Sequence, residues 1–338
     1  MSKRLVSLFA GIGGFDLGFE QAGFTVVAQV EKAKQCRELL AAKWPDAAAL
    51  DDVCTAGAHN LPPCDVITFG FPCQDLSVAG KRAGLAGGRS GLFYHATRII
   101  NELTPSYCLF ENVPGLLSSS RGNDFERVLR EMDRVGYSGA WRVLDAQWLG
   151  VPQRRRRVFG LFSCLDSGAE RCAEILSLPE SLRGHPPPGR KAEEESPSPF
   201  AFGAGADRKH VNRIDDDSRI ATQTIGFTQS SFGGYREGCG TLRASGGDLG
   251  GGSETLIVDA IVSGDNPRNI VPARMAVRRL TTTECERMQG FPDGWTARFS
   301  DTVRYRMLGN AVCVNVAEWI ARRMAATMDG QNMTRKEI

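Results

Sequence analysis

The sequence has few of the features that mark membrane, secreted or metal-binding proteins. None of its apolar runs approaches the roughly 20 residues that a membrane span needs. Its ten cysteines include no C-x-x-C pair and it has only four histidines, so neither a zinc site nor a disulfide framework is expected. Met1–Arg4 leads straight into an expected strand, without a secretory signal. We therefore expect a metal-free protein of the reducing cytoplasm, away from membranes.

An excess of charge is also missing. The 41 Lys and Arg residues nearly balance the 39 Asp and Glu residues, and the formal net charge is +2. Any affinity for nucleic acid must therefore come from local clusters of basic residues. With 42% hydrophobic residues in 338, the chain can bury a sizeable core as one large domain or as two.

The N-terminal stretch has the pattern of a nucleotide-binding βαβ unit. An apolar run, Leu5–Phe9, precedes a turn of small residues, Ala10–Gly14, and apolar residues at helical spacing follow. The next apolar run ends at Glu31, about 20 residues past the glycines, where an acid can reach ribose hydroxyls. Asp16 stands where a dinucleotide fingerprint has a third glycine. The pattern favours a nucleoside without a pyrophosphate, and a purely structural turn is the alternative.

Cys73 follows an apolar run, Asp65–Gly70, that we expect to be a parallel strand. Open α/β sheets bind ligands at that edge, so the thiol is a candidate nucleophile. A buried, inert cysteine is the alternative. The stretch from Gln74 to Gly91 mixes glycines with basic residues, which predicts a lid over a bound substrate or, alternatively, a flexible surface loop.

Two more carboxylates lie at the ends of expected strands. Asp52 follows a short apolar stretch, where it could accept a hydrogen bond from an adenine amino group or cap a helix. Glu111 ends the expected strand Tyr107–Phe110.

Four consecutive arginines follow Gln153. Alternation along an extended segment would point Gln153, Arg155 and Arg157 one way and Arg154 and Arg156 the other. One face of this segment could therefore point into the site, while the other meets solvent or phosphates.

The composition changes after Phe162. Leu182–Gly205 is rich in Pro, Gly, Ser and charge, which predicts a linker with little structure. Ile225–Asp259 is dense in Gly, Ser and Thr and could form an adaptable surface that follows a DNA groove or, equally, poorly ordered turns. Thr281 and Glu284 predict a capping box for a helix that ends at Gly290, and an amphipathic helix reaches Met324.

Several blocks, in order along the chain, resemble the DNA (cytosine-5)-methyltransferase family, which depends on S-adenosylmethionine. The resemblance covers Leu5 to about Phe162 and Met275 to about Met324, and the segment between matches weakly. These blocks are Phe9–Gly14, Glu31, Pro72–Gln74, Glu111–Val113, Gln153-x-Arg155-x-Arg157, Arg279–Leu280 through Gly290–Pro292, and Gly309–Val312.

The resemblance implies a catalytic set. Cys73 would attack carbon-6 of cytosine, and Glu111 would hydrogen-bond the ring nitrogen and amino group. Arg157 would hold the base's carbonyl oxygen, and Arg155 would order the loop. Because this chemistry cannot reach a stacked base, the cytosine would be flipped out of the duplex.

The resemblance also implies binding residues. Phe9 would stack on the adenine of the cofactor, Glu31 would bind the ribose and Asp52 the adenine amino group. The other implied cofactor contacts are Gly11, Gly13, Gly14, Val53, Pro72, Leu92, Asn310 and Val312. The expected DNA contacts are Gln74, Ser77, Arg89, Gln153, Thr241, Leu242 and Arg243.

We expect an α/β fold with a Rossmann-like class I methyltransferase sheet, mostly parallel and seven-stranded, with the last helix returning to the first strand. Residues 1–162 and 301–338 would form the catalytic domain. Residues 163–300 would form a smaller, irregular β-rich target-recognition domain with a flexible stretch at 182–224.

The expected activity is methylation of a specific double-stranded DNA site by a monomer. A restriction-modification system is the expected setting, in which a cognate endonuclease would not be physically bound; an orphan enzyme is the alternative. The same chemistry on RNA is the alternative. A catalytically silent DNA-binding module is less consistent with a chain that keeps Cys73, Glu111 and Arg157.

Overall fold

A computed structural model describes residues 2–72, 91–178, 220–229, 235–237, 242, 255–263 and 271–330. The chain divides into two compact units. The first comprises residues 1–145, 156–185 and 311–338, and the second comprises residues 146–155 and 186–310. The expected flexible stretch 182–224 lies outside the described residues, apart from residues 220–224.

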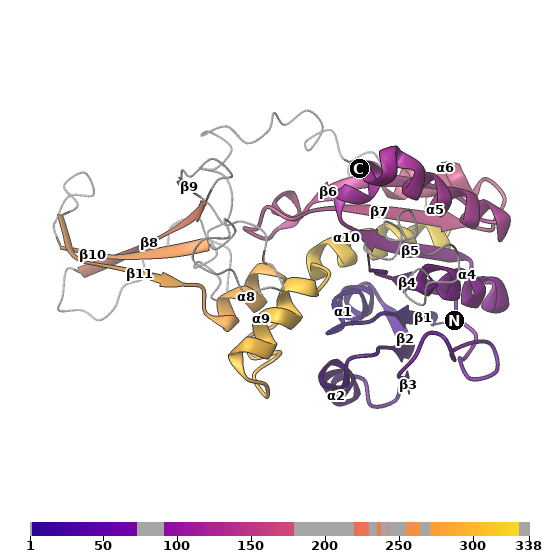
Figure 1. Cartoon of the computed structure of the whole chain (residues 1–338), viewed down its shortest axis with the longest axis horizontal. Helices are drawn as coiled ribbons and strands as arrows, with labels where there is room; N and C mark the ends of the chain where they lie inside the picture. The colour runs from indigo at the N-terminus through magenta and orange to yellow at the C-terminus, as the bar shows by residue number, and fades with distance from the viewer. Residues whose placement is uncertain are drawn as a thin grey trace. The chain divides into compact units, whose positions relative to one another are not determined.

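A seven-stranded sheet forms the centre of the first unit (Figure 1). Its strand order from edge to edge is β3-β2-β1-β4-β5-β7-β6. Neighbouring strands are parallel except at β7, which runs antiparallel to both β5 and β6. The expected mostly parallel sheet is therefore confirmed. The strands are β1 (Lys3–Leu8), β2 (Phe24–Val30), β3 (Ala48–Leu50), β4 (Val66–Phe69), β5 (Tyr107–Asn112), β6 (Ser138–Asp145) and β7 (Arg156–Ser163).

Helices connect and cover these strands. They are α1 (Gly14–Gln21), α2 (Lys34–Lys43), α4 (Leu92–Leu103), α5 (Asn123–Arg134), α6 (Gly168–Ile175) and α10 (Val314–Met328), with short 3-10 helices η2 (Pro114–Leu117) and η3 (Ser119–Gly122). The last of them, α10, packs against α1 so closely that a Cβ on Gly18 would lie 2.7 Å from Ala317 Cβ. The last helix thus returns to the helix that follows the first strand.

Aromatic rings fill the core beneath the carboxyl ends of the central strands. All four residues of β4 are buried, as expected for a parallel strand covered on both faces. The rings of Phe71 and Phe93 lie 4.9 Å apart, and those of Phe71 and Phe110 lie 5.8 Å apart. Burying such a side chain contributes about 2–3 kcal/mol, so this cluster fixes the backbone that leads to Cys73.

The described residues of the second unit form an antiparallel sheet, the α-helices α8 and α9, and a 3-10 helix. The sheet order is β11-β10-β8-β9. Its elements are η4 (Ala146–Leu149), β8 (Ile220–Gln229), β9 (Tyr235–Glu237), β10 (Thr255–Ser263), β11 (Val271–Arg279), α8 (Thr282–Met288) and α9 (Asp301–Asn310). The predicted capping box is confirmed: the Glu284 N–H donates to Thr281 Oγ1 at 3.2 Å, and the Thr281 N–H donates to Glu284 Oε2 at 2.7 Å.

Two helices were not expected from the sequence, α6 and α9. The unit boundaries also divide the chain differently from the expected domains, because residues 163–185 belong to the first unit and residues 146–155 and 301–310 to the second. The functional division into a catalytic and a target-recognition domain stays a prediction. The expected α/β class with a Rossmann-like sheet and a smaller β-containing part is confirmed.

Candidate active site

The turn between β1 and α1 is built for close backbone contacts. Phe9 has a φ of 54°, which is rare for a residue with a side chain. Gly13, with a φ of 84°, has no room for a Cβ, which would lie 2.6 Å from the Trp44 ring. A Cβ on Gly14 would lie 2.3 Å from the carbonyl oxygen of Val312. The turn and Val312, both expected to bind the cofactor, therefore lie together.

Glu31 holds this turn from the end of β2. Its Oε2 accepts a hydrogen bond from the Gly11 N–H at 2.8 Å, and its Oε1 accepts one from the Ala33 N–H at 2.8 Å. A carboxylate oxygen has more than one lone pair, so these bonds leave the carboxylate able to accept ribose hydroxyls.

Asp52 follows β3. The sequence left two roles open for it, an acceptor for an adenine amino group and a helix cap, and its contacts are consistent with both. Its Oδ1 accepts a hydrogen bond from the Cys54 N–H at 2.9 Å, which is a capping contact. Its Oδ2 lies 2.7 Å from Lys32 Nζ. The Lys32 hydrogen bond, with that from Cys54, lowers the pKa of Asp52 to about 2. Asp52 is therefore an ionised acceptor at neutral pH, while its neighbour Val53 is buried in the core.

Glu111 and Arg157 form an ion pair at the carboxyl end of β5. Arg157 Nε lies 2.9 Å from Glu111 Oε1, and the two side chains are 14% and 13% exposed. They come from neighbouring antiparallel strands, β5 and β7. A Cβ on Gly70 would lie 3.8 Å from Glu111 Oε2, so the carboxylate stands beside the chain that leaves β4 toward Cys73.

Asn112 is a site residue to which sequence reasoning gave no role. Its buried side chain donates from Nδ2 to the Phe71 carbonyl at 3.0 Å and accepts from the Val113 N–H at 2.8 Å. It therefore fixes the backbone two residues before Cys73. The available signal was a polar amide placed directly after the acid at the end of an apolar strand.

Several expected site residues lie outside the described residues: Cys73, Gln74, Ser77, Arg89, Thr241 and Arg243. Pro72 is exposed at the edge of the described chain. Leu92 begins α4 and packs, half-buried, against the core.

In the second unit, Gln153 and Arg155 hold the backbone of Leu242. The Leu242 N–H donates to Gln153 Oε1 at 3.3 Å, and Arg155 Nη1 donates to the Leu242 carbonyl at 3.2 Å. Arg155 Nη2 also donates to the Gly309 carbonyl at 3.2 Å. The predicted alternation holds from Gln153 to Arg156, since Gln153 and Arg155 are buried, Arg154 is half-buried and Arg156 is exposed, but Arg157 is half-buried like Arg154.

Gln153 does not lie where a DNA contact requires. Its side chain is fully buried, and its Nε2 donates to the Met288 carbonyl at 3.0 Å. Both ends of the amide are thus used inside the protein, so the placement contradicts the expected DNA contact. The composition of an arginine-rich segment predicts that its glutamine is exposed. Gln153 is buried instead, because the backbones of Met288 and Leu242 bind both ends of its amide.

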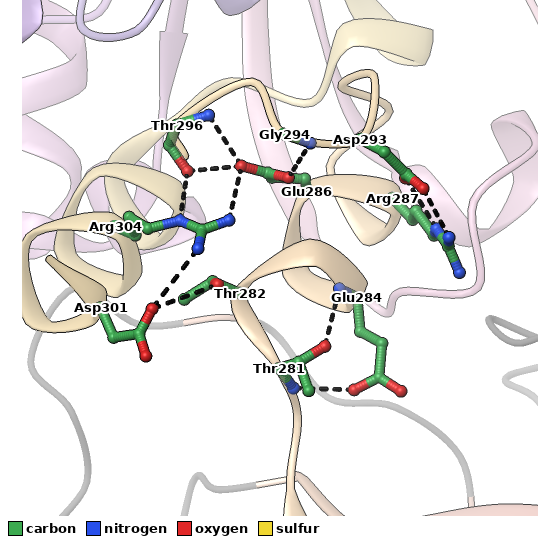
Figure 2. A network of polar contacts seen from close by, with 10 residues as sticks. All are labelled: Thr281, Thr282, Glu284, Glu286, Arg287, Asp293, Gly294, Thr296, Asp301 and Arg304. Atoms are coloured by element: carbon green, nitrogen blue, oxygen red, sulfur yellow. Dashed lines mark hydrogen bonds and ion pairs between the residues drawn. The ribbon is translucent and has the colours of Figure 1, made fainter. Parts of the chain in front are cut away.

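A buried acid organises the helices that lead to Asn310 (Figure 2). Glu286 Oε1 lies 3.2 Å from Arg304 Nη2, and it also accepts from the Thr296 N–H at 2.8 Å. Its Oε2 accepts from the Gly294 N–H at 2.7 Å. The network ties α8, the turn after it and α9 together. Asn310, the last residue of α9, is exposed.

These residues suit the nucleoside part of S-adenosylmethionine. The Gly14 turn leaves no space for a side chain, Glu31 offers oxygens for ribose hydroxyls, and Asp52 offers an ionised acceptor for an amino group. Among the described residues, no three His, Cys, Asp or Glu side chains are grouped to bind a metal. In the same part of the chain, no helix is both long and apolar enough to cross a membrane.

The sequence is similar to that of known proteins. The sequence matches the C-5 cytosine-specific DNA methylase family over residues 3–171 and 199–326. It is 30% identical over 333 residues to the Type II methyltransferase M2.BsuMI of Bacillus subtilis, which covers 95% of this chain and 75% of that protein. It is 31% identical over 332 residues to M.NlaX of Neisseria lactamica, with 96% and 97% covered.

A third relative is similar in sequence, and a solved structure is similar in fold. Type II methyltransferase M.HhaI of Haemophilus parahaemolyticus is 28% identical over 344 residues, covering 96% of this chain and 95% of that protein. The solved structure of the Entamoeba histolytica methyltransferase EhMeth has a TM-score of 0.61 at 16% identity, with 98% of this chain and 100% of that chain covered. At that identity the likeness supports the fold alone.

Proposed function

This chain belongs to the C-5 cytosine-specific DNA methylase family, and from that premise we propose how its residues share the reaction. The protein is a DNA (cytosine-5-)-methyltransferase that uses S-adenosylmethionine. Its family and its Type II relatives support DNA over RNA as the substrate.

Cys73 is the proposed nucleophile. Its thiolate adds to carbon-6 of a flipped-out cytosine, which breaks the aromaticity and makes carbon-5 enamine-like. S-adenosylmethionine supplies the methyl group from its sulfonium. Carbon-5 then loses its proton to water, the bond from carbon-6 to sulfur breaks, and the ring and the thiolate are restored.

The Glu111–Arg157 pair is the observation that carries this proposal. The carboxylate stands beside Gly70, three residues before Cys73, and its partner guanidinium is largely buried with it. Glu111 would hydrogen-bond the ring nitrogen and amino group as the thiolate adds, and Arg157 would bind the carbonyl oxygen. Asn112 would set the position of Cys73 by holding the Phe71 carbonyl.

The cofactor would lie across the carboxyl ends of β1, β2 and β3. Phe9 would stack on the adenine, Glu31 would accept from the ribose hydroxyls and Asp52 from the adenine amino group. The backbone from Gly11 to Gly14 would pass the methionine part. Val53, Pro72, Leu92, Asn310 and Val312 would complete the pocket.

The second unit would recognise the target site. Arg155 and Gln153 would position Leu242 from inside the unit, because together they bind its backbone carbonyl and its backbone N–H. We propose that Thr241 and Arg243, which flank Leu242 in the sequence, contact DNA. We propose that Gln74, Ser77 and Arg89 contact DNA from the loop that carries Cys73.

The cellular setting is inferred from the relatives. The curated proteins that this chain resembles are bacterial and archaeal Type II methyltransferases. We propose that this enzyme acts as a monomer in the cytoplasm, within a restriction-modification system, and that it does not bind the cognate endonuclease.

Cysteine and acid variants test the mechanism. Cys73→Ala should abolish labelled methyl transfer to duplex DNA, and Glu111→Gln should slow it at least about 100-fold, a typical loss for an acid or base. Both variants should bind S-adenosylmethionine within about twofold of the natural protein by calorimetry, since neither side chain is assigned to the cofactor. Cys164→Ala, at an exposed cysteine, is the matched control and should be fully active.

A covalent trap provides the second measurement. Duplex DNA with 5-fluorocytosine at the target should remain attached to the natural protein on a denaturing gel, because fluorine cannot leave as a proton does. Normal methyl transfer by Cys73→Ala, or trapping at another residue, would refute the proposed nucleophile. The target site itself can be mapped as 5-methylcytosine in an unmethylated expression host.

A further inference from the structure

Helix α4 contacts the segment that carries Asp52. We infer that Arg98 and Glu102 of α4 are positioning residues for the adenine side of the cofactor site. This inference rests on the proposed role of Asp52 and extends the site to side chains that do not touch the cofactor.

Arg98 donates hydrogen bonds to main-chain carbonyls of the segment that follows Asp52. Its Nη2 lies 3.2 Å from the Val53 oxygen, 3.4 Å from the Cys54 oxygen and 2.8 Å from the Ala56 oxygen. One guanidinium therefore holds a run of backbone that belongs to no regular helix or strand. A planar group with several fixed donors suits this task, and an ammonium does not.

Glu102 completes the clamp one turn further along α4. Its Oε1 accepts from Arg98 Nη1 at 2.7 Å, and its Oε2 accepts from the Ala58 N–H at 3.0 Å. A Cβ on Gly57 would lie 2.4 Å from Glu102 Oε2, so the segment comes as close to the pair as a glycine allows.

The clamped backbone is the turn that orients Asp52. The Ala56 N–H donates to the Asp52 carbonyl at 3.1 Å, and the Cys54 N–H donates to Asp52 Oδ1 at 2.9 Å. Arg98 donates to the carbonyls of Cys54 and Ala56, the residues whose N–H groups bind Asp52. A displacement of this turn would therefore move the Asp52 carboxylate directly.

Stability is a weaker explanation for the pair. The Arg98 and Glu102 side chains are 36% and 32% exposed, and ion pairs four residues apart on an accessible helix face contribute little to folding. Hydrogen bonding to an amino group, in contrast, depends on the position of the acceptor within a fraction of an ångström. Loss of Arg98 should therefore weaken binding more than it lowers stability.

The test compares Arg98→Met with Arg322→Met. Arg322 pairs with Glu318 at the same four-residue spacing in α10, 2.6 Å apart, and has no assigned contact with the cofactor site. We expect Arg98→Met to raise the calorimetric Kd and the KM for S-adenosylmethionine about tenfold, with kcat at saturating cofactor within about twofold. Arg98→Lys should show an intermediate loss, and Arg322→Met should match the natural protein.

Double variants separate this inference from the proposed site. If Arg98 acts through Asp52, then Arg98→Met should add nothing to the Kd of Asp52→Ala. An unchanged Kd in Arg98→Met or Arg98→Lys beside a raised Kd in Asp52→Ala would refute the inference and leave the site intact. An unchanged Kd in Asp52→Ala would refute the assigned adenine acceptor and, with it, the positioning role.

Discussion

Asp16 is a fully buried carboxyl in the first turn of α1. Gln29 Nε2 donates to its Oδ1 at 2.7 Å, while its Oδ2 has no hydrogen-bond partner among the described residues. Burial, only partly offset by the Gln29 hydrogen bond, raises the pKa of Asp16 to about 6. The residue that takes the place of a third glycine in the turn is therefore a buried acid that titrates close to neutrality.

The raised pKa predicts a pH-dependent stability. Between the unfolded pKa near 3.8 and the folded pKa near 6, the folded protein keeps a proton that the unfolded chain has released. The contribution of Asp16 is thus fully present below the unfolded pKa and is lost as pH rises through about 6. The free energy gained by Asp16→Asn should be greater at pH 8 than at pH 5, by about 1.4 kcal/mol for the one pH unit below the folded pKa.

Denaturant unfolding of the two proteins at both pH values checks this. The asparagine side chain of the variant would keep an oxygen for Gln29 without carrying a charge at any pH. The difference between the two proteins therefore isolates one titration from all others. Equal differences at pH 5 and pH 8 would contradict the raised pKa.

Between elements, an ion pair joins α8 to α9 beside the apolar residues that both helices bury. Glu286 is fully buried and pairs with Arg304, whose side chain is 12% exposed. Beside it, Arg287 and Asp293 form a second pair that joins α8 to the same turn, but these side chains are 31% and 53% exposed (Figure 2). The two neighbours on one helix therefore differ chiefly in burial.

That difference predicts unequal losses of stability. Glu286→Ala removes the buried partner of Arg304, which keeps the exposed Asp301, and leaves two backbone N–H groups without their acceptor, so it should cost about 3–5 kcal/mol. Arg287→Ala removes an exposed pair and should cost less than about 1 kcal/mol. Urea unfolding followed by tryptophan fluorescence measures both, since Trp295 is buried in this segment. Similar losses in the two variants would contradict the assignment.

Across the whole molecule, the sequence indicated those features that depend on residue type and spacing. The central strands followed from apolar runs, and Thr281 with Glu284 predicted a cap that both hydrogen bonds confirm. The alternation from Gln153 to Arg155 followed from the period of an extended chain. The ion pair of Glu111 and Arg157 was not predicted as a contact, although both residues were expected in one site.

What the sequence could not indicate is held by contacts with backbone. Arg98, Asn112 and Gln153 each donate to main-chain carbonyls, and a carbonyl leaves no trace in residue type. Helix α6 is short, and the buried side chain of Arg323 on α10 donates from Nε to the Ile175 carbonyl at 2.6 Å. A helix that is capped from a distant part of the chain cannot be recognised from its own residues.

The packing of α10 against α1 predicts what a C-terminal truncation would do to cofactor binding. A chain that ends after Asn310 lacks α10, which packs on α1, and lacks the Val312 carbonyl that lies against Gly14. We expect it to lose calorimetric binding of S-adenosylmethionine entirely, because nothing then packs against the Gly14 turn from the Val312 side. A chain that ends after Gly330 keeps all of α10 and should bind normally. Cofactor binding by the shorter chain would contradict this role of α10.

The contact between Gly14 and Val312 also sets a time for the enzyme's maturation. Residues are synthesised at about 5–20 per second, so Val312 leaves the ribosome roughly 15–60 seconds after the Gly14 turn that it packs against. Throughout that interval the first strand and helix lack their last partner. A growing chain of this enzyme therefore cannot methylate DNA before Val312 has been synthesised and has reached Gly14.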